Sequence, residues 1–305
     1  MDDSEGDDDL SGYVRKKLRR SLVGDLDMAR REVTEQSVEV GITRREVTEQ
    51  RVEVDITRRE VTEKQVELGA KDRFNLSRLD GAEDCGVLLG DPVFLAQRDK
   101  ARARAAPRYN QVLRSIIKDL PSFDRLVLFR DEDFVIIFDG FPKSRFHFLV
   151  MPLEGSPLCV DGVSNLIKLE KEIGGIQPAL KKLHTLSQEF VAALEDRTKI
   201  RFVCGFHAVP SCLPLHYHVL SHDLRGAKMH SKEHWNSFTR RDFFVSAEVV
   251  LRAMQSGVEL DMCTDKKENV DQRLRCPTCE GELDSFAKMK EHRRHCRSLR
   301  QIFKL

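Results

Sequence analysis

The sequence predicts an α+β fold in which a mostly antiparallel sheet packs on one long helix, followed by a small separate module at the C-terminus. Short apolar runs bounded by acidic or glycine-containing turns indicate strands in the middle of the chain. Residues 178–194 carry apolar side chains on one helical face, which indicates a single long amphipathic helix. Strands interrupted by one long helix are typical of α+β domains with antiparallel sheets.

The predicted strands begin after Pro107, where the compact part of the chain starts. The first two, at 126–129 and 134–138, are separated by the acidic turn 130–133, which is the arrangement of a hairpin. Asp139-Gly140 marks the next turn, because this dipeptide favours turn conformations. The remaining strands are expected at 146–151, 201–207 and 215–221.

Composition allows a sizeable core and excludes several classes of protein. Of 305 residues, 40% are hydrophobic and 33% are charged, while the net charge of +1 offers no bulk attraction to nucleic acid. No apolar run approaches the roughly 18 residues of a membrane span, and the N-terminus does not read as a secretory signal. We therefore expect no membrane partner and an intracellular, reducing compartment, where grouped cysteines indicate metal ligands.

The first hundred residues differ from the rest of the chain. The segment Arg31-Glu32-Val33-Thr34-Glu35 recurs from Arg45 and again from Arg59. Its apolar positions fit neither a heptad nor a strand throughout, so we interpret the repeat as low-complexity and disordered, with a coiled coil as the alternative. The basic run 15–20 indicates either a nuclear-import signal or a solvated charged face. We expect an extension of this kind over residues 1–105.

Two histidines alternate on the predicted strand 215–221. Alternate side chains of a strand share one face, so His216 and His218 point the same way while Tyr217 and Val219 pack on the core. Burying imidazoles without partners costs free energy, so chemistry explains the pair better than packing does. Catalysis is the favoured interpretation, and a zinc site at these histidines is the competing one.

Near the C-terminus, Cys276-x2-Cys279-x12-His292-x3-Cys296 has the spacing of metal ligands. The two-residue gap lets both thiolates reach one ion from a tight turn. His292 and Cys296 lie four residues apart and share one face of a predicted helix. His295 is the alternative fourth ligand. We expect a structural zinc ion here.

The predicted zinc module carries a basic helix. From 287 to 305, seven Lys or Arg residues oppose Glu291 alone, which is the electrostatic footprint of a phosphate-binding surface or, alternatively, a solvated charged helix. A single finger favours recognition of a DNA nick or end over a base sequence. The candidate DNA-binding residues on this segment are Lys288, Lys290, Arg293, Arg294 and Arg297.

The sequence also resembles the histidine-triad family, whose signature is His-Φ-His-Φ-His-Φ-Φ (Φ apolar), and within it the aprataxin branch. The resemblance covers about 107–300 and includes the C-terminal zinc finger. It implies a histidine-triad domain over 106–262 and a zinc-finger domain over 263–305. The segments that carry it are Phe141-Pro142-Lys143-Ser144-Arg145-Phe146-His147, Val203-Cys204-Gly205-Phe206-His207-Ala208-Val209-Pro210-Ser211 and His234-Trp235-Asn236-Ser237-Phe238.

The resemblance implies a nuclear DNA-repair hydrolase that removes AMP from 5′-adenylated DNA left by abortive ligation. By position in the motif, His216 would be the nucleophile that forms a covalent His–AMP intermediate, from which water releases AMP. The partner would be nicked or 5′-adenylated double-stranded DNA, and catalysis would need no cofactor. Donors that stabilise the phosphate charge would be His218, which can also act as general acid, and His207, Lys143 and Ser211.

Three further residues match family positions. Asp139 matches the acidic residue that holds ribose hydroxyls, although an Asp-Gly turn alone would also explain it. His147 matches a supporting active-site histidine, with a partly buried strand histidine as the alternative. Tyr109 matches an aromatic residue that stacks on a terminal base pair, a contact worth about 1–3 kcal/mol.

The chain departs from the family pattern at the first triad histidine, which is Pro214 here. Proline is tolerated at the first residue of a strand, and the lost imidazole is the supporting one, so we expect activity. The alternatives are a nick- or end-binding protein with a degenerate triad and a histidine-triad hydrolase of small adenylates. Gly226, His230 and Glu233 also differ from the family pattern.

Overall fold

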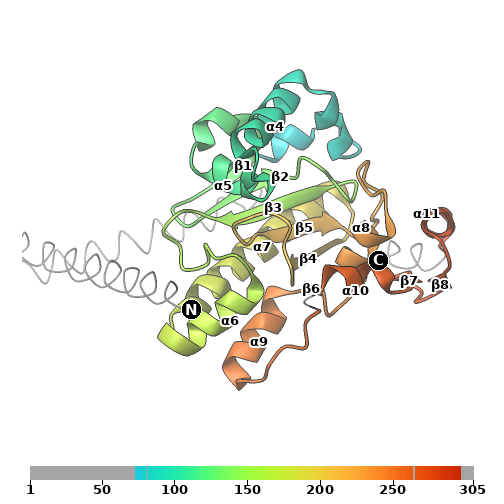
Figure 1. The fold of residues 1–305 in the computed structure, drawn as a ribbon. Coiled ribbons are helices and arrows are strands. Elements are labelled where there is room, and N and C mark those ends of the chain that lie inside the picture. The colour runs from blue at the N-terminus through green and yellow to red at the C-terminus, as the bar shows by residue number, and fades with distance from the viewer. Residues whose placement is uncertain (1–72, 81, 264, 297–305) are drawn as a thin grey trace, which may run out of the picture. The chain divides into compact units, whose positions relative to one another are not determined.

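The computed structural model describes residues 73–80, 82–263 and 265–296 of the chain (Figure 1). The N-terminal repeat, its predicted disorder and the basic run 15–20 lie outside the described residues. The chain divides into two units, 1–67 and 68–305, and every described residue belongs to the second.

A six-stranded sheet forms the centre of the second unit, with every neighbouring pair of strands antiparallel, as predicted. The order β1-β2-β3-β5-β4-β6 places β5 in the interior, between β3 and β4. Both neighbours therefore fix the direction of the side chains on β5. The strands are β1 (Val127–Arg130), β2 (Phe134–Phe138), β3 (His147–Pro152), β4 (Phe202–His207), β5 (Tyr217–Ser221) and β6 (Phe244–Val245).

Helices cover both faces of the sheet (Figure 1). The predicted long helix is α7 (Ile176–Thr198), whose Phe190 ring lies 5.2 Å from that of Phe148 on β3. It covers one face together with α6 (Val163–Ile173) and α9 (Ala247–Ser256). On the other side lie α4 (Pro92–Ala105), α5 (Val112–Ile117) and α8 (Lys232–Thr239). Short 3₁₀ helices span Leu76–Leu79, Cys85–Gly90, Tyr109–Gln111 and Leu120–Leu126.

The hydrophobic core begins well before the predicted domain start at residue 106. Residues 73–105, which we expected in the N-terminal extension, contribute Phe74, Leu79, Phe94 and Ala101 to the core beside the sheet. Before α4, Leu79 lies on a 3₁₀ turn and Phe74 on a bend, so no strand or helix periodicity marks them in the sequence. The structure therefore extends the compact region toward the N-terminus.

The C-terminal module consists of α10 (Lys266–Asp271), the hairpin β7 (Leu274–Arg275) and β8 (Glu282–Leu283), and α11 (Phe286–His295). It packs on the sheet domain through a second hydrophobic cluster. Trp235 of α8 donates its indole N–H to the Arg275 carbonyl oxygen at 2.9 Å. Leu220 of β5 lies in the same cluster as Met289 of α11. In the described part of the chain, no helix is long and apolar enough to cross a membrane.

Candidate active site and metal centre

The register of three strands, β3, β5 and β4, brings predicted catalytic histidines to one face of the sheet. Directly opposed residues of antiparallel strands share a face, and His218 lies opposite Leu149 on β3 and Gly205 on β4. Side chains two residues along each strand point the same way, which adds His147 and His207 to that face. His216 comes directly before β5 and points into the same cavity.

The ring orientation of His216 is set by the main chain. Its Nδ1 lies 3.0 Å from the carbonyl oxygen of Pro214. A carbonyl oxygen only accepts hydrogen bonds, so Nδ1 carries the proton and Nε2 keeps its lone pair. The His216 side chain is 5% exposed and lines the cavity. This arrangement presents an imidazole nitrogen that is able to act as a nucleophile.

His147 and His218 form a hydrogen-bonded pair whose proton positions follow from their neighbours. The Lys143 backbone N–H donates to His147 Nδ1 at 3.2 Å, so the ring proton of neutral His147 is on Nε2. That Nε2–H donates to His218 Nδ1 at 3.0 Å. The proton of His218 is consequently on Nε2, which is buried and has no hydrogen-bond partner among the described residues. A buried donor of this kind needs an acceptor from a ligand.

Burial keeps these imidazoles neutral near pH 7. It lowers the pKa of His147 to about 4, against the attraction of Asp139. Burial also lowers the pKa of His216, although the Pro214 carbonyl opposes the shift, and it lowers that of His218 well below the ordinary value. Neutral histidine is the form that can attack phosphorus or share a neutral hydrogen bond.

His207 lies at the outer edge of the histidine cluster. Its ring centroid is 4.4 Å from that of His218 and 4.6 Å from that of Phe238 on α8. Phe238 also stands perpendicular to the rings of His147 and His218. Aromatic packing therefore holds the predicted supporting histidines in place, and α8 provides the central ring.

Asp139 and Lys143 flank the cavity from the turn after β2. Asp139 accepts the Phe141 N–H at 2.6 Å, and the Lys143 ammonium donates to the Phe141 carbonyl oxygen at 2.9 Å. Burial opposes ionisation of Asp139, yet His147, Lys143 and the Phe141 N–H hold its pKa below the ordinary value. Burial lowers the pKa of Lys143, and Asp139 opposes that shift. With His147 neutral, Lys143 and the N–H group are the partners that keep Asp139 ionised near pH 7.

A cavity of about 430 Å³ joins these groups. Its inner wall is apolar, with Leu113, Ile116 and Ile137 from α5 and β2 among its residues. Each residue that we predicted for catalysis or nucleotide binding lines it, and the exposed Tyr109 lies on its edge at 48% exposure. The predicted residues that line it are Asp139, Lys143, His147, His207, Ser211, His216 and His218.

Several polar cavity residues were not predicted from the sequence. Arg98 and Arg102 come from α4, Lys228 comes from the loop after β5, and His234 comes from α8. A start signal for α4 is present, because Asp91 caps Val93 N–H at 2.8 Å and Pro92 occupies the first helical position. Asp91 and Pro92 would therefore have predicted the start of a helix at residue 92. They carry no signal that this helix lines the cavity.

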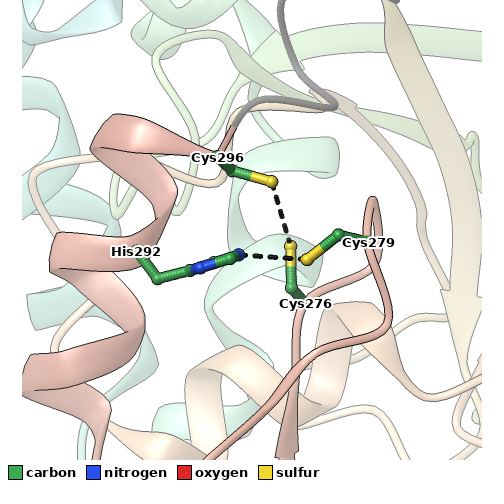
Figure 2. Close-up of side chains that lie close together, drawn as sticks. All are labelled: Cys276, Cys279, His292 and Cys296. Carbon is green, nitrogen blue, oxygen red and sulfur yellow. Dashed lines mark hydrogen bonds between the residues drawn. The ribbon is translucent and has the colours of Figure 1, made fainter.

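The four predicted metal ligands converge in the C-terminal module (Figure 2). Their ligand atoms all lie within 4.8 Å of one another. Cys279 Sγ is 3.2 Å from His292 Nε2, and Cys276 Sγ is 3.9 Å from Cys296 Sγ (Figure 2). Burial works to raise the pKa of Cys276, yet backbone N–H groups of the turn lower it to about 6. Three sulfur donors and one imidazole nitrogen fit a tetrahedral zinc ion.

The structure favours Cys296 over His295 as the fourth ligand. The Cys296 side chain is buried and points at the other three (Figure 2). His295 instead points outward, with its side chain 74% exposed and its Nε2 2.9 Å from a Glu291 carboxylate oxygen. The spacing in the sequence allows either residue to be the fourth ligand. The path of the chain at the end of α11 decides between them, because it directs Cys296 inward and His295 outward.

One predicted DNA-binding residue has a different position from the one expected. Arg293 is 1% exposed and donates to the His222 carbonyl oxygen and to Thr278 Oγ1, each at 2.7 Å. Because the Arg293 guanidinium is buried and hydrogen-bonded within the protein, it is not available to a phosphate. Lys288 and Arg294 do lie exposed on α11, but they pair with Asp284 and Glu291.

Lys290, the other described member of this set, lies 5.9 Å from the Phe286 ring centroid. Arg297 lies outside the described residues. The described part of α11 therefore presents fewer unpaired cations than the count of basic residues suggests. For this helix to bind DNA as predicted, a phosphate would have to displace the carboxylates that pair with Lys288 and Arg294.

The fold and the strand histidines together define a histidine-triad protein in which proline replaces the first histidine. The family profile described as "Scavenger mRNA decapping enzyme C-term binding" matches residues 110–234. The solved structure of Hnt3 has the same fold, with a TM-score of 0.50 and 22% identity, and covers 63% of this chain and 98% of that chain.

Two curated relatives give a closer assignment. Aprataxin of Gallus gallus is 30% identical over 184 residues, which make up 60% of this chain and 54% of that protein. An aprataxin-like protein of Schizosaccharomyces pombe is 31% identical over 185 residues, which make up 56% of this chain and 75% of that protein. The chain belongs to the aprataxin family. It spans about half the length of the first relatives it matches.

Proposed function

We propose that this protein removes AMP from 5′-adenylated DNA, leaving a 5′-phosphate, and acts in DNA strand-break repair in the nucleus. The observation that carries the proposal is the pair of tautomers in the cavity. His216 offers a lone pair on Nε2, and His218 offers a buried, unsatisfied N–H beside it. A nucleophile next to a hydrogen-bond donor is the arrangement that attack on a phosphoanhydride requires.

In the first step, His216 Nε2 attacks the adenylate phosphorus. The N–P bond forms while the P–O bond to the DNA 5′-phosphate breaks, and the departing phosphate takes the electron pair. The second pKa of such a phosphate is about 6, so it can leave near pH 7 with a hydrogen bond from His218 and without full proton transfer. The modified His216 carries positive charge, which the Pro214 carbonyl oxygen and Asp139 favour.

In the second step, a water oxygen adds to the phosphorus of the His216 adduct. The N–P electron pair returns to Nε2, one water proton passes to solvent and AMP leaves. The Pro214 carbonyl oxygen keeps the ring in the same tautomer throughout, so the nucleophile is restored without a separate proton shift. Splitting the hydrolysis in this way replaces one difficult step with two easier ones.

The other cavity residues have binding roles in this proposal. Asp139 receives the ribose hydroxyls at the mouth of the apolar wall, and Ser211 donates to the adenylate phosphate. Lys143 offsets the negative charge that gathers at phosphorus, and His207 donates a hydrogen bond there. These assignments rest on the positions of the four residues around one cavity and on the charges of Asp139 and Lys143.

Pro214 is compatible with activity because its contribution comes from the main chain. The hydrogen bond that orients His216 uses the carbonyl oxygen of residue 214, which proline supplies as well as any other residue. This supports an enzyme over a DNA-end-binding protein with a degenerate triad. His147, which holds His218, provides a second imidazole in the supporting position.

The zinc module and Tyr109 support DNA as the substrate. A structural zinc ion held by Cys276, Cys279, His292 and Cys296 would stabilise the fold of the module and take no part in the reaction. Tyr109 is exposed at the edge of the cavity, where a terminal base pair of nicked DNA can stack on its ring.

The test is a gel assay on a nicked duplex with a labelled 5′-adenylated end, comparing wild type with His216→Ala. His184→Ala is the matched control, because His184 lies on α7, away from the cavity. We expect conversion to 5′-phosphate by wild type and the control, and a loss of about 10³-fold or more in His216→Ala. Labelled AMP should also be trapped on wild type after a denaturing alkaline quench, which preserves the P–N bond, and be absent from His216→Ala. Tight duplex binding by wild type without conversion would instead support the end-binding alternative.

A further inference from the structure

Helix α4 adds two arginines to the wall of the cavity. Arg98 and Arg102 both line it, one helical turn apart. The helix ends at Ala105, before the family profile match begins at residue 110. Its contribution to the cavity is therefore a property of this chain that the matched region does not contain.

The two arginines have different surroundings. Arg98 packs its stem on Gly140, where an added Cβ would meet its Cγ at 3.0 Å, and pairs with Asp99 at 2.9 Å. Arg102 has no carboxylate within ion-pair distance among the residues that the structure describes. Arg98 is thus committed to the protein, whereas the charge of Arg102 is uncompensated.

Arg102 is held at the mouth of the cavity by two aromatic rings. Its guanidinium carbon lies 5.5 Å from the Tyr109 ring centroid and 5.4 Å from that of Phe141. Ring faces attract the cation but accept none of its in-plane N–H donors. The guanidinium edge therefore remains available for hydrogen bonds, and its planar fork matches the oxygens of a phosphate.

The position of Arg102 at the mouth of the cavity indicates which phosphate group it would contact. The adenylate phosphorus must lie at His216, which is 5% exposed. Arg102 is exposed and stands beside Tyr109, which is 48% exposed. A small adenylate that fills the inner cavity ends before this position, whereas the strand that leaves the adenylate must pass the mouth.

We propose that Arg102 binds a backbone phosphate of the polynucleotide beyond the adenylate, so that α4 selects adenylated polynucleotides over small adenylates. This inference rests on the proposed function and adds a specificity determinant to the same cavity. The guanidinium acts with Tyr109: the ring takes the terminal base, and the cation that it supports takes the adjoining phosphate.

The test compares Arg102→Gln with Arg104→Gln in the full-length, zinc-loaded protein. Both changes remove one positive charge from the same helix. Arg104 pairs with Asp119 at 2.7 Å and does not line the cavity, so it controls for net charge. Binding of a labelled nicked duplex with a 5′-phosphate, and separately of AMP, is measured by fluorescence anisotropy and calorimetry at several salt concentrations.

We expect Arg102→Gln to weaken duplex binding about five- to tenfold and to reduce the salt slope by about one, as for loss of one phosphate contact. AMP affinity should change less than about twofold, because AMP ends before the mouth. Arg104→Gln should leave both affinities within about twofold of wild type. Equal losses in the two variants, or an equal loss for AMP and duplex, would overturn the proposal. Arg102→Lys keeps the charge without the planar fork, so its affinity for the duplex should lie between those of wild type and Arg102→Gln.

Turnover gives an independent comparison. For Arg102→Gln, kcat/KM should fall about tenfold on adenylated nicked duplex through KM, and stay at the wild-type value on adenosine 5′-phosphoramidate. If wild type fails to convert adenylated duplex at all, the proposed hydrolase function fails. The binding comparison still decides the role of Arg102 in that case, because it needs no chemistry.

Discussion

At the residue scale, a main-chain carbonyl controls the reactive nitrogen. His216 donates its Nδ1 proton to the oxygen of residue 214, so replacing the side chain there by proline leaves the contact in place. His147 is positioned in the same manner by the Lys143 backbone N–H. Both tautomers thus depend on the path of the backbone, and substitutions that move the backbone should matter more than loss of the first triad imidazole.

Gly226 is such a position. It donates its N–H to the Lys143 carbonyl oxygen at 3.0 Å, and a Cβ there would stand 2.4 Å from the Lys143 carbonyl carbon and from the Pro142 oxygen. We expect Gly226→Ala to cost about 1–3 kcal/mol of stability and to lower kcat on adenylated duplex by up to about 10²-fold through displacement of the Lys143 loop.

Gly90→Ala is the control for this change, because nothing lies within 4 Å of a Cβ at Gly90 and it should behave like wild type. Chemical denaturation gives the stability, and steady-state kinetics on the nicked duplex give kcat. A Gly226→Ala protein with the wild-type kcat would show that catalysis does not depend on where the Lys143 loop lies.

At the scale of elements, α11 is anchored to the sheet domain by a buried cation. Arg293 connects the Thr278 hydroxyl and the Cys276 thiol in the metal-binding turn to the His222 carbonyl oxygen, directly after β5. The helix that carries His292 and is followed by Cys296 is thereby joined to the strand that carries His218. Arg293 is a positioning residue for the module, whereas we had predicted a phosphate contact.

We expect Arg293→Met to destabilise the protein by about 1–3 kcal/mol, because the His222 and Thr278 oxygens lose their donor. It should also hasten zinc release to a chelator. Arg294→Met, a neighbouring change at a solvent-exposed ion pair, should cost no more than about 0.5 kcal/mol. Denaturant unfolding and a colorimetric zinc-release assay are the measurements. Equal behaviour of the two variants would rule out an anchoring role for Arg293.

At the scale of the whole molecule, burial of several neutral histidines makes the fold sensitive to acid. The unfolded chain binds a proton at each histidine near pH 6.5, whereas folded His147 does so only at about 4. The folded state therefore binds fewer protons in this window. Stability is fully present above pH 6.5 and is lost as the pH falls toward 4.

For His147 alone, the loss amounts to about 3 kcal/mol. His216 and His218 act in the same direction, because burial lowers both pKa values. The measurement is the free energy of unfolding of wild type and His147→Asn at pH 7.5, 6.5, 5.5 and 4.5. The difference between the two proteins isolates His147 from the zinc ligands, which also take up protons. It should shrink as the pH falls; a constant difference would contradict a neutral, buried His147.

The predicted strands and the long helix could be found from the chain alone because their apolar patterns are regular. The strand from 134 to 138 and the alternation around Tyr217 are examples, and both appear in the sheet where they were expected. The core residues before α4 could not be predicted in this way. Phe74 and Leu79 are buried, but they lie on a bend and a short 3₁₀ turn. Such irregular backbone leaves no apolar period to detect in the sequence.

The sequence also could not predict the direction in which individual side chains point. Spacing along α11 indicated metal ligands and a basic surface, but it could not tell that Arg293 points inward while Arg294 points outward. Likewise, nothing local to α4 indicates that Arg102 stands against Tyr109 and Phe141. These placements are decided by how elements pack, because a helix face acquires its role only from what covers it.

Local chemistry could therefore be predicted in advance: two histidines directed to one cavity from β5 and the residue just before it, and four donors spaced for one metal ion. Such features depend on the geometry of a single strand, turn or helix, which neighbouring residues determine. The tertiary structure alone decided which tautomer His218 adopts, because its Nδ1 pairs with His147 on another strand, and which arginine of α4 has no carboxylate partner among the described residues. Those properties depend on contacts between segments far apart in the chain, and only the folded arrangement brings them together.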